Sequence, residues 1–144
     1  MSDANDASAL VKLVDEPIDI VAISETLSDY ESGAHSLFLG TTRRTTQSRQ
    51  TEYLVYDAYR PMAKSELSRL AGEAFERWSL KRLVIVHRLG RVDLGEASIA
   101  IGASAPHRKA VFESIPWLMD QIKSCVPIWK QENWSDGTSE WVHP

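Results

Sequence analysis

Two lysines near the C-terminal end of the chain, Lys123 and Lys130, stand seven residues apart in the stretch KSCVPIWKQE. On an uninterrupted helix this spacing is about two turns and would bring both ammonium groups to one face. Pro127 lies between them, and a proline removes a helical N–H and disfavours helical angles in the residue before it. We therefore expect a helix that ends near Cys125 and a strand that starts at Ile128, so that the lysines meet only across the turn.

The chemistry open to such lysines depends on their surroundings. A lysine in a partly desolvated, cation-rich pocket can lose its proton and act as an amine nucleophile or base, or it can stay charged and stabilise a developing anion. A nearby ammonium can also activate a thiol such as that of Cys125, although a lone cysteine near a helix end is more often a packing residue. Exposed lysines usually do none of this, so the residues alone leave the role open.

The stretch SAPHRKA places His107 and Arg108 in the first turn of a predicted helix that follows a predicted strand. The free backbone N–H groups and the positive end of the helix dipole favour an anion there, and an arginine adds a bidentate grip on phosphate. The alternative is a solvated helix start without a ligand. A bound phosphate would explain why cationic side chains occupy this end of the helix.

A second basic region follows Gly40, which ends a predicted buried strand. Arg43, Arg44 and Arg49 lie on the polar segment RRTTQSRQ, which we expect to be a mobile loop. Such a loop can close over an anionic ligand because the arginine fork matches phosphate geometry. The sequence lacks the GxxxxGK[ST] pattern, which argues against a nucleotide P-loop.

Composition limits the classes of function. With 144 residues, 43% hydrophobic and 25% charged, the chain fits one globular domain. A net charge of −4 argues against binding of nucleic acid or anionic membrane. A single cysteine allows no internal disulfide and favours the cytoplasm. The histidines show no metal-ligand spacing. No run of residues is long and apolar enough for a membrane span.

The elements that must position these residues follow from periodicity. Strands are predicted at 9–14, 34–42, 51–59, 81–90 and 96–105, with a turn at 91–96. Helices are predicted from Pro17, Pro61 and Pro106, the last one kinked at Pro116. The order β-α-β-β-α-β-β-α-β-β indicates the α+β class, with a disordered lead at 1–9 and a single domain at 10–144.

Five stretches carry a family resemblance: FLGTTR, YRPMA, VIVHRLGRVDLGE, APHR and LMDQIKSCVPIWKQE. They occur in the order of the family and cover roughly residues 10 to 143. Together they resemble the large, catalytic subunit of molybdopterin synthase. This resemblance implies an α/β-hammerhead type of α+β fold, with mixed, largely antiparallel sheets and about three helices.

The resemblance also implies an activity in molybdenum cofactor biosynthesis. The family's enzymes are sulfurtransferases that convert a cyclic pyranopterin monophosphate, precursor Z, into the dithiolene-bearing molybdopterin. The sulfur comes from a thiocarboxylate on the C-terminal glycine of a small ubiquitin-like subunit. The large subunits form the central homodimer of a heterotetramer, and neither a cofactor nor a metal is implied.

Carried over position by position, the resemblance makes Lys123 the central active-site lysine and Lys130 the second one. Glu132 falls on an acidic position of the family motif and is expected to contact substrate. Gln131 departs from the pattern, because the family often has a basic residue between the second lysine and this acid.

The resemblance assigns binding of the precursor's phosphate to Arg43, His107 and Arg108. Arg44 is a further candidate, because a shift of one residue in the basic segment would put it in place of Arg43. The sequence leaves open whether Arg43 serves the pocket of its own chain or that of its neighbour.

Two other functions remain compatible with these residues. One is a non-catalytic regulatory or scaffold domain that senses an anionic phosphate metabolite through Arg43, His107 and Arg108. The other is a lyase that forms a Schiff base on Lys123. The first predicts ligand binding that does not depend on Lys123, and the second predicts that borohydride traps a carbonyl ligand on it.

Overall fold

A computed structural model of the protein describes residues 8–143, and within them the chain forms three helices and nine strands. Most of the predicted lead at 1–9 lies outside the described residues, while Ser8 and Ala9 already belong to the first strand. The elements are β1 (Ser8–Val14), α1 (Ile20–Thr26), β2 (Ala34–Thr41), β3 (Thr45–Thr46), β4 (Arg49–Ala58), α2 (Arg60–Arg77), β5 (Arg82–Arg88), β6 (Gly90–Asp93), β7 (Ala97–Ala105), α3 (Arg108–Cys125), β8 (Ile128–Trp134) and β9 (Ser139–Val142). The predicted α+β class is confirmed, and β3 and β6 are additions to the predicted order.

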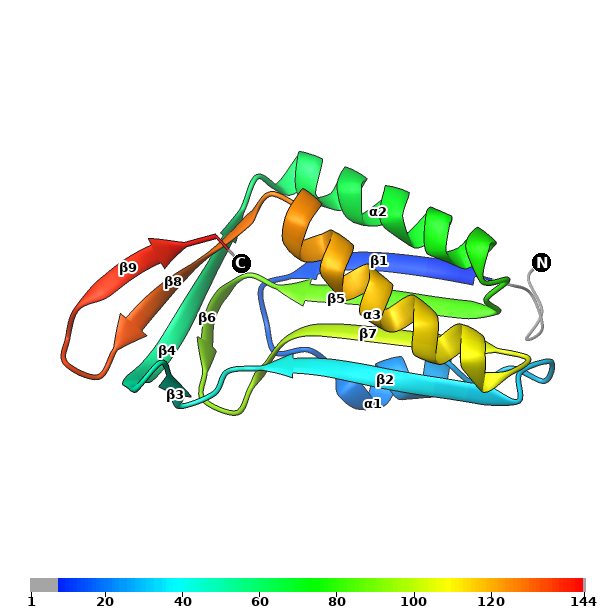
Figure 1. The fold of residues 1–144 in the computed structure, drawn as a ribbon, viewed down its shortest axis with the longest axis horizontal. Coiled ribbons are helices and arrows are strands. Elements are labelled where there is room, and N and C mark those ends of the chain that lie inside the picture. The colour runs from blue at the N-terminus through cyan, green and yellow to red at the C-terminus, as the bar shows by residue number, and fades with distance from the viewer. Residues whose placement is uncertain (1–7, 144) are drawn as a thin grey trace.

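The first sheet has the strand order β1-β5-β7-β2, with β1 parallel to β5 and the other pairs antiparallel. Helices α2 and α3 lie side by side over one face of this sheet, and α1 lies on the opposite face (Figure 1). Since β5 is covered on both faces, its sequence reads as a continuous apolar run rather than an alternating one. None of the helices within residues 8–143 is long and apolar enough to cross a membrane.

Alternate residues of β5 divide the core into two parts. Leu83 and Ile85 pack toward α2 and α3, whereas Val84 and Val86 pack with Leu27 at the α1 side. Most of the buried apolar side chains lie between the first sheet and helices α2 and α3, so the main hydrophobic core is on this side of the sheet.

The second sheet stands at one end of the first, on the left in Figure 1, and has the order β3-β4-β8-β9 with β6 also paired to β4. Gly90 connects the two sheets: its φ of +87°, in the region that favours glycine, turns the chain from β5 into β6. The predicted turn at 91–96 is therefore wrong in its first half, because residues 91–93 pair with β4.

The prediction of a loop at 43–50 is wrong for most of this segment, which forms a hairpin. Thr45 and Thr46 pair with Gln50 and Arg49 in a tight hairpin. Its two turn residues, 47 and 48, have φ of +50° and +68°. Two successive left-handed residues are what a two-residue hairpin turn requires, although this turn contains no glycine.

Two helix boundaries show how local chemistry sets the ends. Helix α1 begins at Ile20 rather than at Pro17, because the Asp19 side chain accepts a hydrogen bond from the Ala22 N–H at 3.1 Å and caps the helix. Helix α3 begins at Arg108 with His107 as its N-cap residue and runs through Pro116 as one helix.

Candidate active site

A pocket of about 330 Å³ lies where the C-terminal end of α3 meets both sheets. Each wall comes from a different element: the end of β2, the β3–β4 hairpin, the ends of β5 and β7, helix α3 and strand β8. It is lined by Phe38, Gly40, Thr41, Thr42, Arg43, Thr46, Thr51, Leu54, Tyr56, His87, Ser98, Ile99, Met119, Ile122, Lys123, Val126, Ile128, Lys130 and Glu132.

Helix α3 contributes one face of its last turns. Met119, Ile122, Lys123 and Val126 all line the pocket, and their spacing of i, i+3, i+4 and i+7 is that of a single helix face. Lys123 is exposed and lies in the last turn, where the helix dipole favours a cation. The helix ends as predicted, with Val126 extended at ψ 129° before Pro127.

Strand β8 continues the wall by alternation. Ile128, Lys130 and Glu132 line the pocket, while Trp129 between them is exposed on the other face. The two lysines therefore border one pocket from a helix end and a strand, which is the meeting across the turn that Pro127 led us to expect.

Glu132 is buried at 5% exposure and is held from two sides. Its Oε2 accepts a hydrogen bond of 3.0 Å from the Thr51 hydroxyl, and its Oε1 lies 4.0 Å from Lys130 Nζ. With Arg43, Lys123 and Lys130 on the wall, this single carboxylate leaves an excess of positive charge. The pocket is therefore suited to an anionic ligand.

The floor of the pocket contains buried polar groups that carry no charge. His87 Nδ1 lies 2.8 Å from the carbonyl oxygen of Arg88, which can only accept, so Nδ1 holds the proton and donates. Burial lowers the pKa of His87 to about 4, despite this hydrogen bond, and the ring is neutral at pH 7. Burial likewise raises the pKa of Tyr56, whose ring meets that of His87 edge to face at 5.0 Å.

A second feature of the floor is a register shift between β2 and β7. Gly40 pairs with Ile99 and Thr41 with Ala97, so Ser98 bulges out and lines the pocket. Gly40 is needed there because a Cβ would come within 2.8 Å of the Ile99 side chain. The hydroxyl of Thr42, two residues after Gly40, is buried in the pocket wall with no hydrogen-bond partner among residues 8–143.

The remaining predicted site residues lie elsewhere. Arg43 lines the same pocket as the two lysines of its own chain, but Arg44 does not. His107 and Arg108 are exposed at the opposite end of α3, and Lys123 lies fifteen residues after Arg108. At about 1.5 Å of rise per residue, roughly 22 Å of helix separates them. One copy of the chain thus does not bring the expected phosphate-binding residues together.

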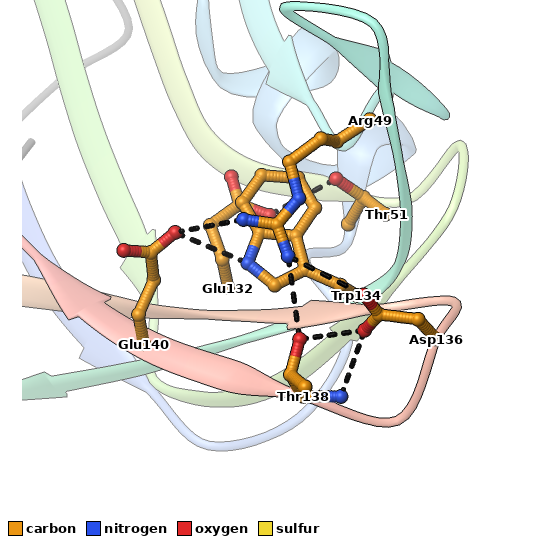
Figure 2. Close-up of polar contacts among 7 residues, drawn as sticks. All are labelled: Arg49, Thr51, Glu132, Trp134, Asp136, Thr138 and Glu140. Atoms are coloured by element: carbon orange, nitrogen blue, oxygen red, sulfur yellow. Dashed lines mark hydrogen bonds and ion pairs between the residues drawn. The ribbon is translucent and has the colours of Figure 1, made fainter.

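Arg49 does not line the pocket either. Its guanidinium stacks on the ring of Trp134 at 4.0 Å and approaches Glu140 at 3.5 Å and Asp136 at 3.6 Å (Figure 2). Trp134 Nε1 also donates to Glu140 at 3.1 Å. These contacts fasten the start of β4 to the β8–β9 hairpin, so Arg49 has a structural role beside the pocket.

Sequence reasoning missed the uncharged polar residues of the pocket. Thr51, Tyr56, His87 and Ser98 are among them. His87 and Ser98 interrupt apolar strands, which was an available signal, whereas Thr51 stands between Gln50 and Glu52 and gave none. Cys125 is exposed and does not line the pocket. Between residues 8 and 143 no group of three or more His, Cys, Asp or Glu side chains is placed to hold a metal ion.

Comparison with known proteins places these features in context. The model of the family described as MoaE protein matches residues 13–125. The molybdopterin synthase catalytic subunit of Bacillus subtilis is 40% identical over 126 residues, which are 88% of this chain and 80% of that protein. That of Drosophila melanogaster is 46% identical over 133 residues, which are 91% of this chain but only 36% of the fly protein. The chain thus spans little more than a third of the fly relative's length.

The fold is shared with a solved structure. The crystal structure of molybdopterin synthase from Staphylococcus aureus superposes with a TM-score of 0.84 at 37% sequence identity. The match covers 90% of this chain and 94% of that one. The two proteins therefore share one fold over most of their length.

Proposed function

Because the chain belongs to the MoaE protein family, we propose that it is the catalytic subunit of a molybdopterin synthase, with residues 10–144 as its catalytic domain. It would convert cyclic pyranopterin monophosphate into molybdopterin, and a small ubiquitin-like subunit would deliver sulfur as a C-terminal thiocarboxylate. The observation that carries this proposal is that Lys123, Lys130 and Arg43 line one and the same pocket. A phosphorylated substrate and a thiocarboxylate are both anions that such a wall attracts.

The roles of the side chains follow from this chemistry. A thiocarboxylate sulfur is already nucleophilic, so the pocket needs no cysteine, and Cys125 lies outside it. Lys123 meets the thiocarboxylate and stabilises negative charge during transfer. Lys130, whose ammonium group lies beside the Glu132 carboxylate, holds the substrate or intermediate. Arg43, at the edge of the pocket, binds the phosphate.

The assembly would supply what one chain lacks. His107 and Arg108 are too far from the pocket of their own chain, so as phosphate ligands they must serve the pocket of a second copy. A two-fold homodimer permits this, because each copy then gives its helix start to the other. With a small subunit bound to each copy the complex is a heterotetramer, which we place in the cytoplasm and which needs no cofactor.

The competing function is a phosphate-metabolite sensor without turnover. Such a domain needs cations, but it does not need a lysine beside a buried carboxylate or a floor of neutral hydrogen-bonding groups. The pocket has both, since Glu132 and His87 line it together with the lysines. These features and the names of the relatives favour the enzyme.

The test is a single-turnover conversion of the cyclic precursor by the protein and a thiocarboxylated small subunit, with wild type beside Lys123→Ala. Product from wild type and little from the variant supports both the reaction and the lysine. Absence of product from wild type, with the donor shown to be intact and bound, would move the assignment to the sensor.

A further inference from the structure

Strand β4 carries a β-bulge at the point where it reaches the pocket. Leu54 lies on the pocket wall, and regular alternation would bring Glu52 to the same wall. The pairing with β8 instead shifts between Thr51 and Tyr53, so that Glu52 is exposed while Thr51 is buried in the wall. The bulge thus places a hydroxyl beside Glu132 where a regular strand would place a second carboxylate.

The contact that results is buried and directional. Thr51 and Glu132 are only 3% and 5% exposed, and the 3.0 Å bond joins Thr51 Oγ1 to Glu132 Oε2. A carboxylate only accepts, so the threonine donates. Figure 2 shows this bond beside the Arg49 and Trp134 contacts that fasten the start of β4.

The other oxygen of the same carboxylate faces the lysine. Glu132 Oε1 lies 4.0 Å from Lys130 Nζ, and the lysine side chain is 31% exposed. A carboxylate turns about its last side-chain bond unless something fixes it. The hydroxyl bond to Oε2 therefore determines where Oε1 points, and with it the position of the ammonium group.

We propose that Thr51 is a positioning residue of this pocket: its hydroxyl orients the Glu132 carboxylate, which in turn holds the Lys130 ammonium over the substrate site. This proposal rests on the proposed function for the turnover that it affects, but the Thr51–Glu132–Lys130 contacts can be tested without turnover. In this role Thr51 acts through Glu132 and Lys130 rather than on the substrate itself.

The experiment compares Thr51→Val, which removes the hydroxyl and keeps the branched shape, with Thr51→Ser, which keeps the hydroxyl. Thr45→Val is the control, because it makes the same change at an exposed position of β3 outside the pocket. The first readout is the single-turnover rate constant and substrate affinity with the thiocarboxylated partner. The second is the rate at which an acylating reagent modifies Lys130, followed by mass spectrometry of the peptide.

Thr51→Val should lower the single-turnover rate constant by roughly tenfold, with a smaller change in affinity, because a buried carboxylate oxygen loses its donor. Thr51→Ser should stay within about twofold of wild type, since the donor is kept. Lys130 should be acylated several-fold faster in Thr51→Val alone, because a lysine that is no longer held against the carboxylate is freer to meet the reagent.

Two results would overturn the positioning role. One is equal acylation of Lys130 in wild type, Thr51→Val and Thr51→Ser. The other is a serine variant as impaired as the valine variant, which would show that the methyl group matters rather than the hydroxyl. If wild type transfers no sulfur but acylation follows the expected order, the proposed function fails and the positioning role stands.

Discussion

The two ends of helix α3 carry similar side chains in opposite surroundings. At its start, His107 and Arg108 are exposed, and the His107 side chain makes no capping bond. At its end, Lys123 borders a pocket that is also lined by the buried side chains of His87 and Glu132. A cationic side chain alone therefore does not make a binding site. The buried polar side chains around Lys123 are what distinguish the two ends of the helix.

The physical reason is screening. Water and salt weaken the field of an exposed cation within about 10 Å, whereas a charge over a buried floor acts through a medium of lower dielectric. The start of α3 gains such surroundings only if another molecule covers it. Four measurements would show whether the two ends of α3 differ in this way.

The largest effect is expected from Lys123→Ala, the cation at the pocket end. Single-turnover sulfur transfer should fall by roughly 10²–10³-fold, because an electrostatic contact made during transfer is lost without replacement. Lys109→Ala, at the opposite and exposed end of the same helix, is the matched control and should leave the rate unchanged. Equal losses in both variants would show that the two ends do not differ as described.

The pH dependence of stability tests whether the His87 ring is shielded from water at the floor of the pocket. Its pKa is about 4 in the folded protein against 6.5 as the ordinary value, so the unfolded chain binds a proton in that window and the folded one does not. This contribution to stability is complete above pH 6.5 and is lost as the pH falls toward 4. From about pH 7 to about pH 4, wild type should lose about 3 kcal/mol more unfolding free energy than His87→Gln in urea titrations. Identical pH profiles would mean that the floor is wet.

Arg43→Ala tests the rim of the pocket. Loss of one bidentate phosphate contact should weaken binding of the cyclic precursor by roughly tenfold, with little change in the rate of bound substrate. Arg44→Ala removes the same group one residue further on, outside the pocket, and serves as control. A larger effect of Arg44→Ala would shift the phosphate site by one residue.

The smallest expected effect tests whether the start of α3 serves a second copy. Two variants, Lys123→Ala and Arg108→Ala, are co-expressed with different tags and the mixed dimer is purified. One of its two pockets then keeps both side chains, so the activity should be about half that of wild type. Each variant alone should remain impaired. A mixed dimer without activity would show that both residues act within one chain, whereas full activity of Arg108→Ala alone would show that Arg108 does not take part.

The end of α3 and the pocket-facing residues of β8 were largely predictable, because residues close in sequence determine both. Pro127 ends α3 through the backbone of its own neighbours, and alternation along β8 then puts Lys130 and Glu132 on one face. Periodicity likewise identified α2 and the paired strands β5 and β7.

The parts that were missed depend on partners far away in the sequence. The turn at 47–48 uses left-handed residues without glycine, so the hairpin gave no turn signal. Strand β6 exists because β4 pairs with it. The bulge that exposes Glu52 and buries Thr51 arises from the register against β8, which strand alternation alone does not reveal.

The bond between Thr51 and Glu132 joins residues 81 positions apart, and β1 pairs in parallel with β5, with Ser8 opposite Arg82. Contacts of such long range are slow to form, because the chain loses loop entropy before they stabilise it. Both the first sheet and the pocket therefore depend on contacts that form late. We expect the pocket to be among the last parts to assemble during folding, when β8 docks on β4.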